Sequence, residues 1–224
     1  DKLKKVIVGV ADYATMPPVD IDTRTINYAG VKPKKKLFGF GDDEYLPIKV
    51  GPFPEEVIEE ANEDLEIFVK FLEGEGVEVV RPKREPVKYY NYCPRDSVFV
   101  HGDFALATPM PLRSRRGEWK AMSEHLPNII DMPCQYINEL YNEDCIGNPD
   151  VLALNEVTPA FDAANTIRAN NDILYLISNS GNELGAKILQ KKLKLSGSDA
   201  RVHLLRDVYS FSHIDTTLVF LREG

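Results

Sequence analysis

Three aspartates occupy similar positions along the chain, each just before a run of β-branched and apolar residues. They are Asp96, Asp162 and Asp215, and His213 lies two residues before the last of them. If the segments that carry these residues surround a common axis, three carboxylates and one imidazole meet in one pocket. That set suits a guanidinium ligand, because a guanidinium is a permanent cation whose planar fork of donors matches paired carboxylates.

An aspartate beside a histidine can also serve proton transfer. The carboxylate fixes the tautomer of the imidazole, and the imidazole then acts as a general acid or base. A structural interpretation stays open for each aspartate, because Asp before a strand or in a tight turn often only accepts hydrogen bonds from backbone N–H groups. The residues alone do not choose between the two interpretations.

The elements that must position these residues begin with a strand predicted at residues 5–10, a short β-branched run. A stretch rich in Pro, Gly, Asp and Lys follows to about residue 53, which predicts a long loop whose basic run at residues 32–36 is solvated. Pro54 then opens a helix, because apolar residues recur at helical spacing as far as Leu72. A strand is predicted at residues 77–80.

From residue 96 onward one unit recurs: an aspartate, two strands joined by a polar tip, and a helix that leads to a further strand. The predicted strands are residues 97–100 and 104–108 in the first copy, 165–169, 173–177 and 202–205 in the second, and 217–221 in a third copy that is only begun; the predicted helices are residues 113–125 and 182–193. Arg113, Arg115 and Trp119 are interpreted as surface and packing residues of the first helix. Repeated hairpin-helix-strand units predict an α/β protein with modules around a common axis.

Composition limits the classes of partner. The 224 residues carry a formal net charge of −8, whereas nucleic acid and anionic membranes are bound through clustered Lys and Arg, so small molecules or other proteins are the expected partners. The longest apolar run near the start, residues 6–10, is far too short for a signal-peptide core or a membrane span. Cys93, Cys134 and Cys145 match neither a zinc site nor a disulfide framework, so we expect a reducing, cytoplasmic setting.

Four short motifs resemble successive motifs of the glycine and inosamine-phosphate amidinotransferases, in that family's order and at compatible spacings. They are Cys93-Pro94-Arg95-Asp96, Ala107-Thr108-Pro109-Met110 with Arg113-Ser114-Arg115, Pro159-Ala160-Phe161-Asp162-Ala163-Ala164 with Ile167-Arg168, and His213-Ile214-Asp215-Thr216-Thr217. The predicted first strand is also similar to that of the family. The resemblance covers most of the chain and is weakest over residues 20–55 and 127–158.

This resemblance implies the pentein fold, a five-bladed α/β propeller of hairpin-helix-strand modules, of which residues 1–224 form a single partial domain with about three blades. It also implies an activity in which a cysteine thiolate attacks the guanidino carbon of arginine, ornithine leaves, and the amidino group passes to an acceptor amine. By motif position, Asp162 and His213 are the expected catalytic pair, while Asp96 and Asp215 hold the guanidinium. The resemblance implies no metal and no organic cofactor.

The sequence departs from the family in one respect that bears on catalysis. The family's nucleophilic cysteine lies near its C-terminus, and an arginine that binds the substrate carboxylate lies beyond the His-x-Asp motif; residues 1–224 contain neither position. Cys93 is the one cysteine near a motif, but it lies in the wrong blade. Because the chain starts at Asp1 without Met and stops at Gly224, within a predicted hairpin, we expect an incomplete family member that does not turn over arginine alone. We expect it to self-associate, or to take up a complementing C-terminal fragment, through an unpaired strand edge.

Two alternatives remain open on the sequence. A guanidino hydrolase such as an arginine deiminase is similar in fold and in its Asp, His and Cys set, but passes the group to water. The chain could also be a truncated module that binds arginine-like ligands or a partner without catalysis, or one half of a split enzyme.

Overall fold

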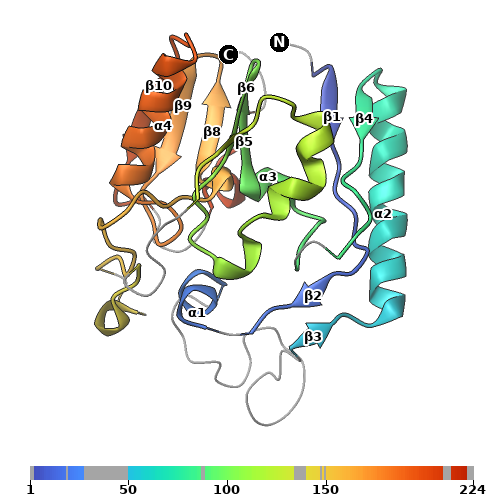
Figure 1. The fold of residues 1–224 in the computed structure, drawn as a ribbon, viewed down its shortest axis with the longest axis horizontal. Helices are drawn as coiled ribbons and strands as arrows, with labels where there is room; N and C mark the ends of the chain where they lie inside the picture. The colour runs from blue at the N-terminus through green and yellow to red at the C-terminus, as the bar shows by residue number, and fades with distance from the viewer. Residues whose placement is uncertain are drawn as a thin grey trace.

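The computed structural model describes residues 3–18, 20–27, 50–86, 89–133, 140–146, 148, 150–208 and 213–220. Its strands form small two- and three-stranded sheets, with the helices α2 (Glu55–Gly74) and α4 (Glu183–Leu195) on opposite outer sides (Figure 1). The basic run at residues 32–36 and Cys134 lie outside the described residues.

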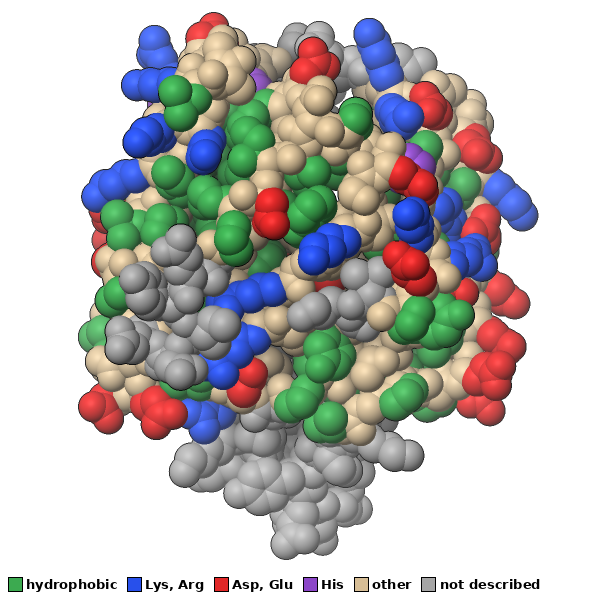
Figure 2. Space-filling model, in the orientation of Figure 1, with side chains coloured by type: hydrophobic (Ala, Val, Ile, Leu, Met, Phe, Trp, Pro, Cys, Tyr) green, Lys and Arg blue, Asp and Glu red, His purple; other side chains and the backbone are tan. Residues whose placement is uncertain are grey.

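The first unit is a parallel pair of strands connected through one long helix. β1 (Lys5–Ile7) pairs with β4 (Glu78–Val80), and α2 packs on them through the buried side chains of Val69 and Leu72. α2 begins after Pro54 with acidic residues in its first turn, where negative charge offsets the partial positive charge of a helix N-terminus. Acidic side chains are seen at the edge of the molecule where α2 begins (Figure 2). The predicted helix and both strands are confirmed, although β1 is shorter than predicted.

The connection from β1 to α2 contains regular structure that the sequence did not predict. It holds β2 (Thr15–Met16), α1 (Ile21–Asn27) and β3 (Gly51–Pro52), which pairs with β2 in antiparallel fashion. At the start of α1, the Asp20 carboxylate accepts a hydrogen bond from the backbone N–H of Thr23 at 3.2 Å. The prediction of an unbroken loop is therefore wrong for these residues, because capping and strand pairing order a segment whose composition is typical of loops.

The second unit is a hairpin followed by a third, parallel strand. β5 (Val98–His101) and β6 (Phe104–Ala107) are antiparallel, as predicted, and Gly102 at the tip has φ +57°, which glycine adopts without strain. β7 (Ile130–Asp131) then pairs parallel to β6.

The helix predicted between β6 and β7 differs in type from the observed structure. Two 3-10 segments occupy this stretch, η1 (Arg113–Arg115) and η2 (Glu118–His125). Gly117 lies between them with φ +84°, in the left-handed region. A residue in that conformation interrupts a helix, so the apolar spacing that predicted one continuous helix is divided between two short turns.

The third unit repeats the second and confirms its prediction. β8 (Thr166–Ala169) and β9 (Asp172–Leu176) form a hairpin, α4 follows, and β10 (Arg201–Leu205) pairs parallel to β9. α4 begins where the Asn182 side chain accepts the backbone N–H of Gly185 at 2.8 Å. The recurrence of hairpin, helix and parallel strand is the α/β arrangement that the sequence predicted.

The strand predicted at residues 217–221 is wrong for the part that the structure describes, residues 217–220. The residues just before them form the 3-10 turn η5 (Ile214–Thr216). The backbone N–H groups of Thr217 and Leu218 both donate to the Ile214 carbonyl, at 3.0 and 2.9 Å, so this local turn uses donors that a strand would need.

The largest buried cluster joins the second and third units. Phe99 and Leu106 from the first hairpin pack with Phe161, Tyr175 and Leu189 of the third unit. This shared core fixes the two hairpins relative to each other. The segments that precede β5 and β8 carry two of the predicted site residues, so the same core sets their spacing.

One more short turn, η3 (Glu143–Cys145), lies in the connection between the second and third units. Of the helices in the described residues, none is long and apolar enough to span a membrane.

We predict that Leu189→Ala lowers the free energy of unfolding by about 2–5 kcal/mol, because the Leu189 side chain is fully buried at the centre of this core. Urea unfolding followed by circular dichroism measures the change. Leu195→Ala is the matched control on the same helix, since Leu195 is 72% exposed, and it should change the free energy by less than about 0.5 kcal/mol. Equal losses in the two variants would contradict the assignment of Leu189 to the core.

Candidate active site

Three of the four predicted site residues meet in one place. The carboxylates of Asp96 and Asp162 and the imidazole of His213 each present a polar atom within 4.8 Å of the others. We call these three residues the site cluster. Asp96 comes from α3 (Pro94–Ser97), whereas Asp162 and His213 precede η4 (Ala163–Asn165) and η5.

Asp162 is fully buried, and its two carboxylate oxygens have different hydrogen-bond partners. Oδ1 accepts the backbone N–H of Ala164 at 3.0 Å, which caps η4. Oδ2 lies 2.9 Å from Nε2 of His213. The structural interpretation of this aspartate is confirmed by Oδ1, and Oδ2 makes the contact with the imidazole that the acid/base interpretation requires.

His213 is held as a cation by its surroundings. Burial alone would lower the pKa of the imidazole, but the charge of Asp162, the hydrogen bond to it and the charges of Asp96 and Asp215 raise the pKa to about 9. A carboxylate is an acceptor, so Nε2–H donates to Asp162 and this bond fixes the orientation of the ring. At neutral pH the ring therefore has a proton to give.

On its buried side, Asp96 is bound by Arg115, a residue that was predicted to lie at the surface of a helix. Arg115 is 4% exposed, and its NH1 donates to Oδ2 of Asp96. The surface assignment is wrong because η1 turns this side chain inward, toward α3. Burial and the charge of Asp162 raise the pKa of Asp96, while the Arg115 guanidinium opposes that rise.

Asp215, the fourth predicted residue, lies at the rim of the site cluster. Its side chain is 29% exposed, and its Oδ1 is 4.0 Å from Nδ1 of His213. Oδ2 forms an ion pair of 3.1 Å with Nε of Arg95, which also donates through NH2 to the Thr166 carbonyl at 2.9 Å. Arg95 belongs to the Cys93-Pro94-Arg95-Asp96 motif, and its contact with Asp215 was not predicted from the sequence.

Cys93 lies beside the site cluster but is not activated. Burial, and then the negative charges of Asp96 and its neighbours, raise the pKa of the thiol to about 12. A thiol is nucleophilic only as its thiolate, so this one is unsuited to attack a carbon centre at neutral pH.

Two carboxylates and one imidazole at this spacing also raise the question of a metal ion. Two of their ligand atoms are already engaged, because Nε2 of His213 binds Asp162 and Oδ2 of Asp96 binds Arg115. A protonated imidazole has no lone pair for a metal at Nε2. The hydrogen bonds therefore favour an acid/base and cation-binding cluster.

We predict a pH-dependent stability that comes from the ion pair of His213 with Asp162. The folded-state pKa of His213 is raised from 6.5 to about 9, so its contribution is fully present below pH 6.5 and is lost as the pH rises through about 9. The free energy of unfolding should fall by up to about 3 kcal/mol across this window, and Asp162→Asn should remove most of that fall. Urea unfolding at a series of pH values measures it.

Asp172→Asn is the control for this prediction, because Asp172 forms a similar pair with His203, at 2.6 Å, on the exposed surface of β9 and β10. That variant should keep the fall. The same pH profile for Asp162→Asn and the unmodified protein would contradict the prediction.

Comparisons with known proteins agree with the motifs. No protein-family model matches the chain. Over 247 aligned residues the chain is 33% identical to "Inosamine-phosphate amidinotransferase 1" of Streptomyces glaucescens, with all of this chain and 66% of that protein covered. The solved inosamine-phosphate amidinotransferase of Streptomyces griseus is 33% identical, with a TM-score of 0.82, and the match covers 99% of this chain and 65% of that one.

A more distant likeness shows the fold alone. A dimethylarginine dimethylaminohydrolase structure matches 73% of this chain and 58% of its own at 18% identity, with a TM-score of 0.51. The fold prediction, a pentein-type α/β protein that is partial, is confirmed by these matches, and the chain spans about two thirds of the length of the curated relatives. Its ordered motifs and its similarity over the whole chain show that this protein belongs to the amidinotransferase family.

Proposed function

We propose that this chain supplies the guanidinium-binding and acid/base part of an amidinotransferase that moves the amidino group of L-arginine to an amine and releases ornithine. The observation that carries the proposal is the buried hydrogen bond between Asp162 and His213 next to the Asp96 carboxylate. That arrangement places a proton donor beside negative charge able to hold a guanidinium, and both are features that the transfer requires.

Each predicted residue then has a role that its contacts support. Asp96 and Asp215 each have one oxygen on a protein arginine, Arg115 or Arg95, and we assign the other oxygen to the substrate guanidinium. Asp162 orients His213 and stabilises its charged form. The partial exposure of Asp215 supports a role in contact with an entering ligand.

The proposed reaction has two halves. A thiolate attacks the guanidino carbon, the bond from that carbon to the ornithine nitrogen breaks, and His213 gives its proton to the leaving amine. An acceptor amine then attacks the amidino-cysteine, His213 takes a proton from it, and the thiolate is released. We assign the thiol to a segment outside residues 1–224, because Cys93 is held protonated.

Transfer is better supported than hydrolysis. The matches that extend over all of this chain at about one third identity are to amidinotransferases, whereas the likeness to a guanidino hydrolase is one of fold. Acceptor choice depends on residues around the pocket that the present contacts do not identify.

We further propose that residues 1–224 act as one partial domain in the cytoplasm, and that the domain is completed by a C-terminal fragment or by association with another copy. Its partners would be a small guanidino compound and an amine. The net charge of −8 supports a cationic substrate, because an anionic surface attracts it.

Appending a C-terminal amidinotransferase segment that carries the family's cysteine should restore activity. We expect ornithine, and no citrulline, from L-arginine in the presence of an amine such as glycine or lysine, measured by mass spectrometry. The same fusion with that cysteine changed to serine is the control and should be inactive. Citrulline as the main product would support hydrolysis, and no product from a folded fusion would support a binding module.

In the complemented enzyme, Asp162→Asn should reduce kcat by about 100- to 10,000-fold, because His213 loses the partner that orients and charges it. Arginine binding should weaken much less, since Asp96 and Asp215 remain. Steady-state kinetics and calorimetric titration separate the two effects. Asp172→Asn, which breaks the exposed pair with His203, should leave both unchanged. An unchanged kcat in Asp162→Asn would remove Asp162 from the mechanism.

A further inference from the structure

Arg115 is a buried arginine next to the site cluster, and protein acceptors bind most of its guanidinium donors. The Arg115 side chain is 5% exposed. Its NH1 donates to Oδ2 of Asp96, its NH2 donates to the Cys93 carbonyl at 2.9 Å, and its Nε donates to Oε2 of Glu118 at 2.9 Å. A planar fork bound on three sides cannot turn away from Asp96 without breaking the other bonds.

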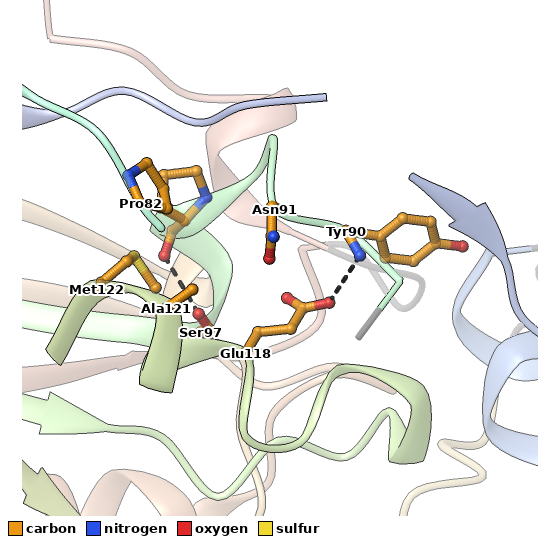
Figure 3. Close-up of a pocket in the computed structure, with 8 residues that line it drawn as sticks. Pro82, Tyr90, Asn91, Ser97, Glu118, Ala121 and Met122 are labelled. Carbon is orange, nitrogen blue, oxygen red and sulfur yellow. Dashed lines mark hydrogen bonds between the residues drawn. The ribbon is translucent and has the colours of Figure 1, made fainter. Parts of the chain in front are cut away.

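Glu118 is held as firmly as Arg115. It is 2% exposed, and its second oxygen, Oε1, accepts the backbone N–H of Tyr90 at 3.1 Å. Figure 3 shows this bond, with the Glu118 carboxylate turned toward the Tyr90 backbone beside Asn91. The Tyr90 ring lies 5.3 Å from Cζ of Arg115, a distance typical of a cation–π contact. Glu118 and Tyr90 together fix the guanidinium that faces Asp96.

Asp96 needs a positive charge next to its carboxylate to stay ionised. It shares the site cluster with a second buried carboxylate, Asp162, and two carboxylates in one buried site tend to bind a shared proton. A protonated Asp96 would no longer be an acceptor at both oxygens and would carry no charge for a guanidinium. The titratable groups that interact with Asp96 or with its arginine include Arg115, Glu118, Asp162, His213, Cys93, Tyr90 and Tyr92.

We propose that Arg115, fixed in place by Glu118, is a positioning residue that keeps Asp96 ionised and oriented, so that the site meets a guanidinium with two carboxylates and no shared proton between them. The importance of Asp96 for arginine rests on the proposed function, whereas the effect of Arg115 on Asp96 does not. Lysine would not replace Arg115 fully, because one ammonium cannot make the three directed bonds of the fork.

The proposal predicts effects of the same direction and unequal size for two substitutions. Arg115→Met removes the cation, so the midpoint at which Asp96 binds a proton should rise by about one pH unit or more. Glu118→Gln weakens the acceptor that holds Nε of Arg115, so the guanidinium is held less firmly against Asp96 and the same midpoint should also rise, by less than in Arg115→Met. Carbon-13 NMR of the Asp carboxyl groups of the 224-residue chain measures both, and Asp96→Asn identifies the signal.

Arg116→Met is the matched control. Arg116 follows Arg115 in the chain but donates to the carbonyls of Met110 and Pro111 at 2.8 and 3.3 Å, so its loss should leave the Asp96 midpoint unchanged. If Arg115 only packs, Arg115→Met should shift the midpoint no more than Arg116→Met does, which would overturn the proposal.

An unchanged midpoint in Arg115→Met would overturn it, and so would an unchanged or lowered midpoint in Glu118→Gln. The second variant decides the matter if the first does not fold. Neither measurement needs arginine, a thiol or turnover, so failure of the proposed function would not be mistaken for failure of this proposal.

Discussion

The hydrogen bond of 2.9 Å between Asp162 and His213 joins residues that are 51 positions apart in the chain, and the candidate site depends on it. A fully buried carboxylate is costly unless its charge is paired, and here the backbone of Ala164 and the imidazole of His213 provide the pairing. The same bond orients the ring and keeps it protonated near neutral pH. The hydrogen bond that compensates the buried charge of Asp162 is therefore the same bond that orients the imidazole of His213.

The other acidic residues of the site are balanced in a similar way. Arg115 compensates Asp96 on the buried side, and Arg95 compensates Asp215 on the exposed side. Each arginine contacts one oxygen of its carboxylate. A cluster of several carboxylates would otherwise destabilise the fold or take up protons, so the protein arginines are part of what makes this cluster compatible with folding.

Much of this arrangement could be predicted from sequence, because it depends on local patterns. The Asp at the start of each hairpin, the polar tips at Gly102 and Asn170, and the apolar spacing of α4 are visible without a structure. The burial of Arg115 was missed, since neighbouring arginines look alike in the sequence and only the turn of η1 directs Arg115 toward α3. The strand predicted at residues 217–221, just after η5, was wrong. Residues with high strand propensity form a strand only when a partner strand accepts their hydrogen bonds.

The most direct test of the account is the titration of His213 by nitrogen-15 NMR with and without saturating L-arginine. If the guanidinium binds among Asp96, Asp215 and His213, the added positive charge should lower the pKa of His213 from its raised value near 9, while the exposed His203 should be unaffected. A His213 pKa that does not change when arginine is added would show that the cation does not bind beside this ring, and the central claim would be contradicted.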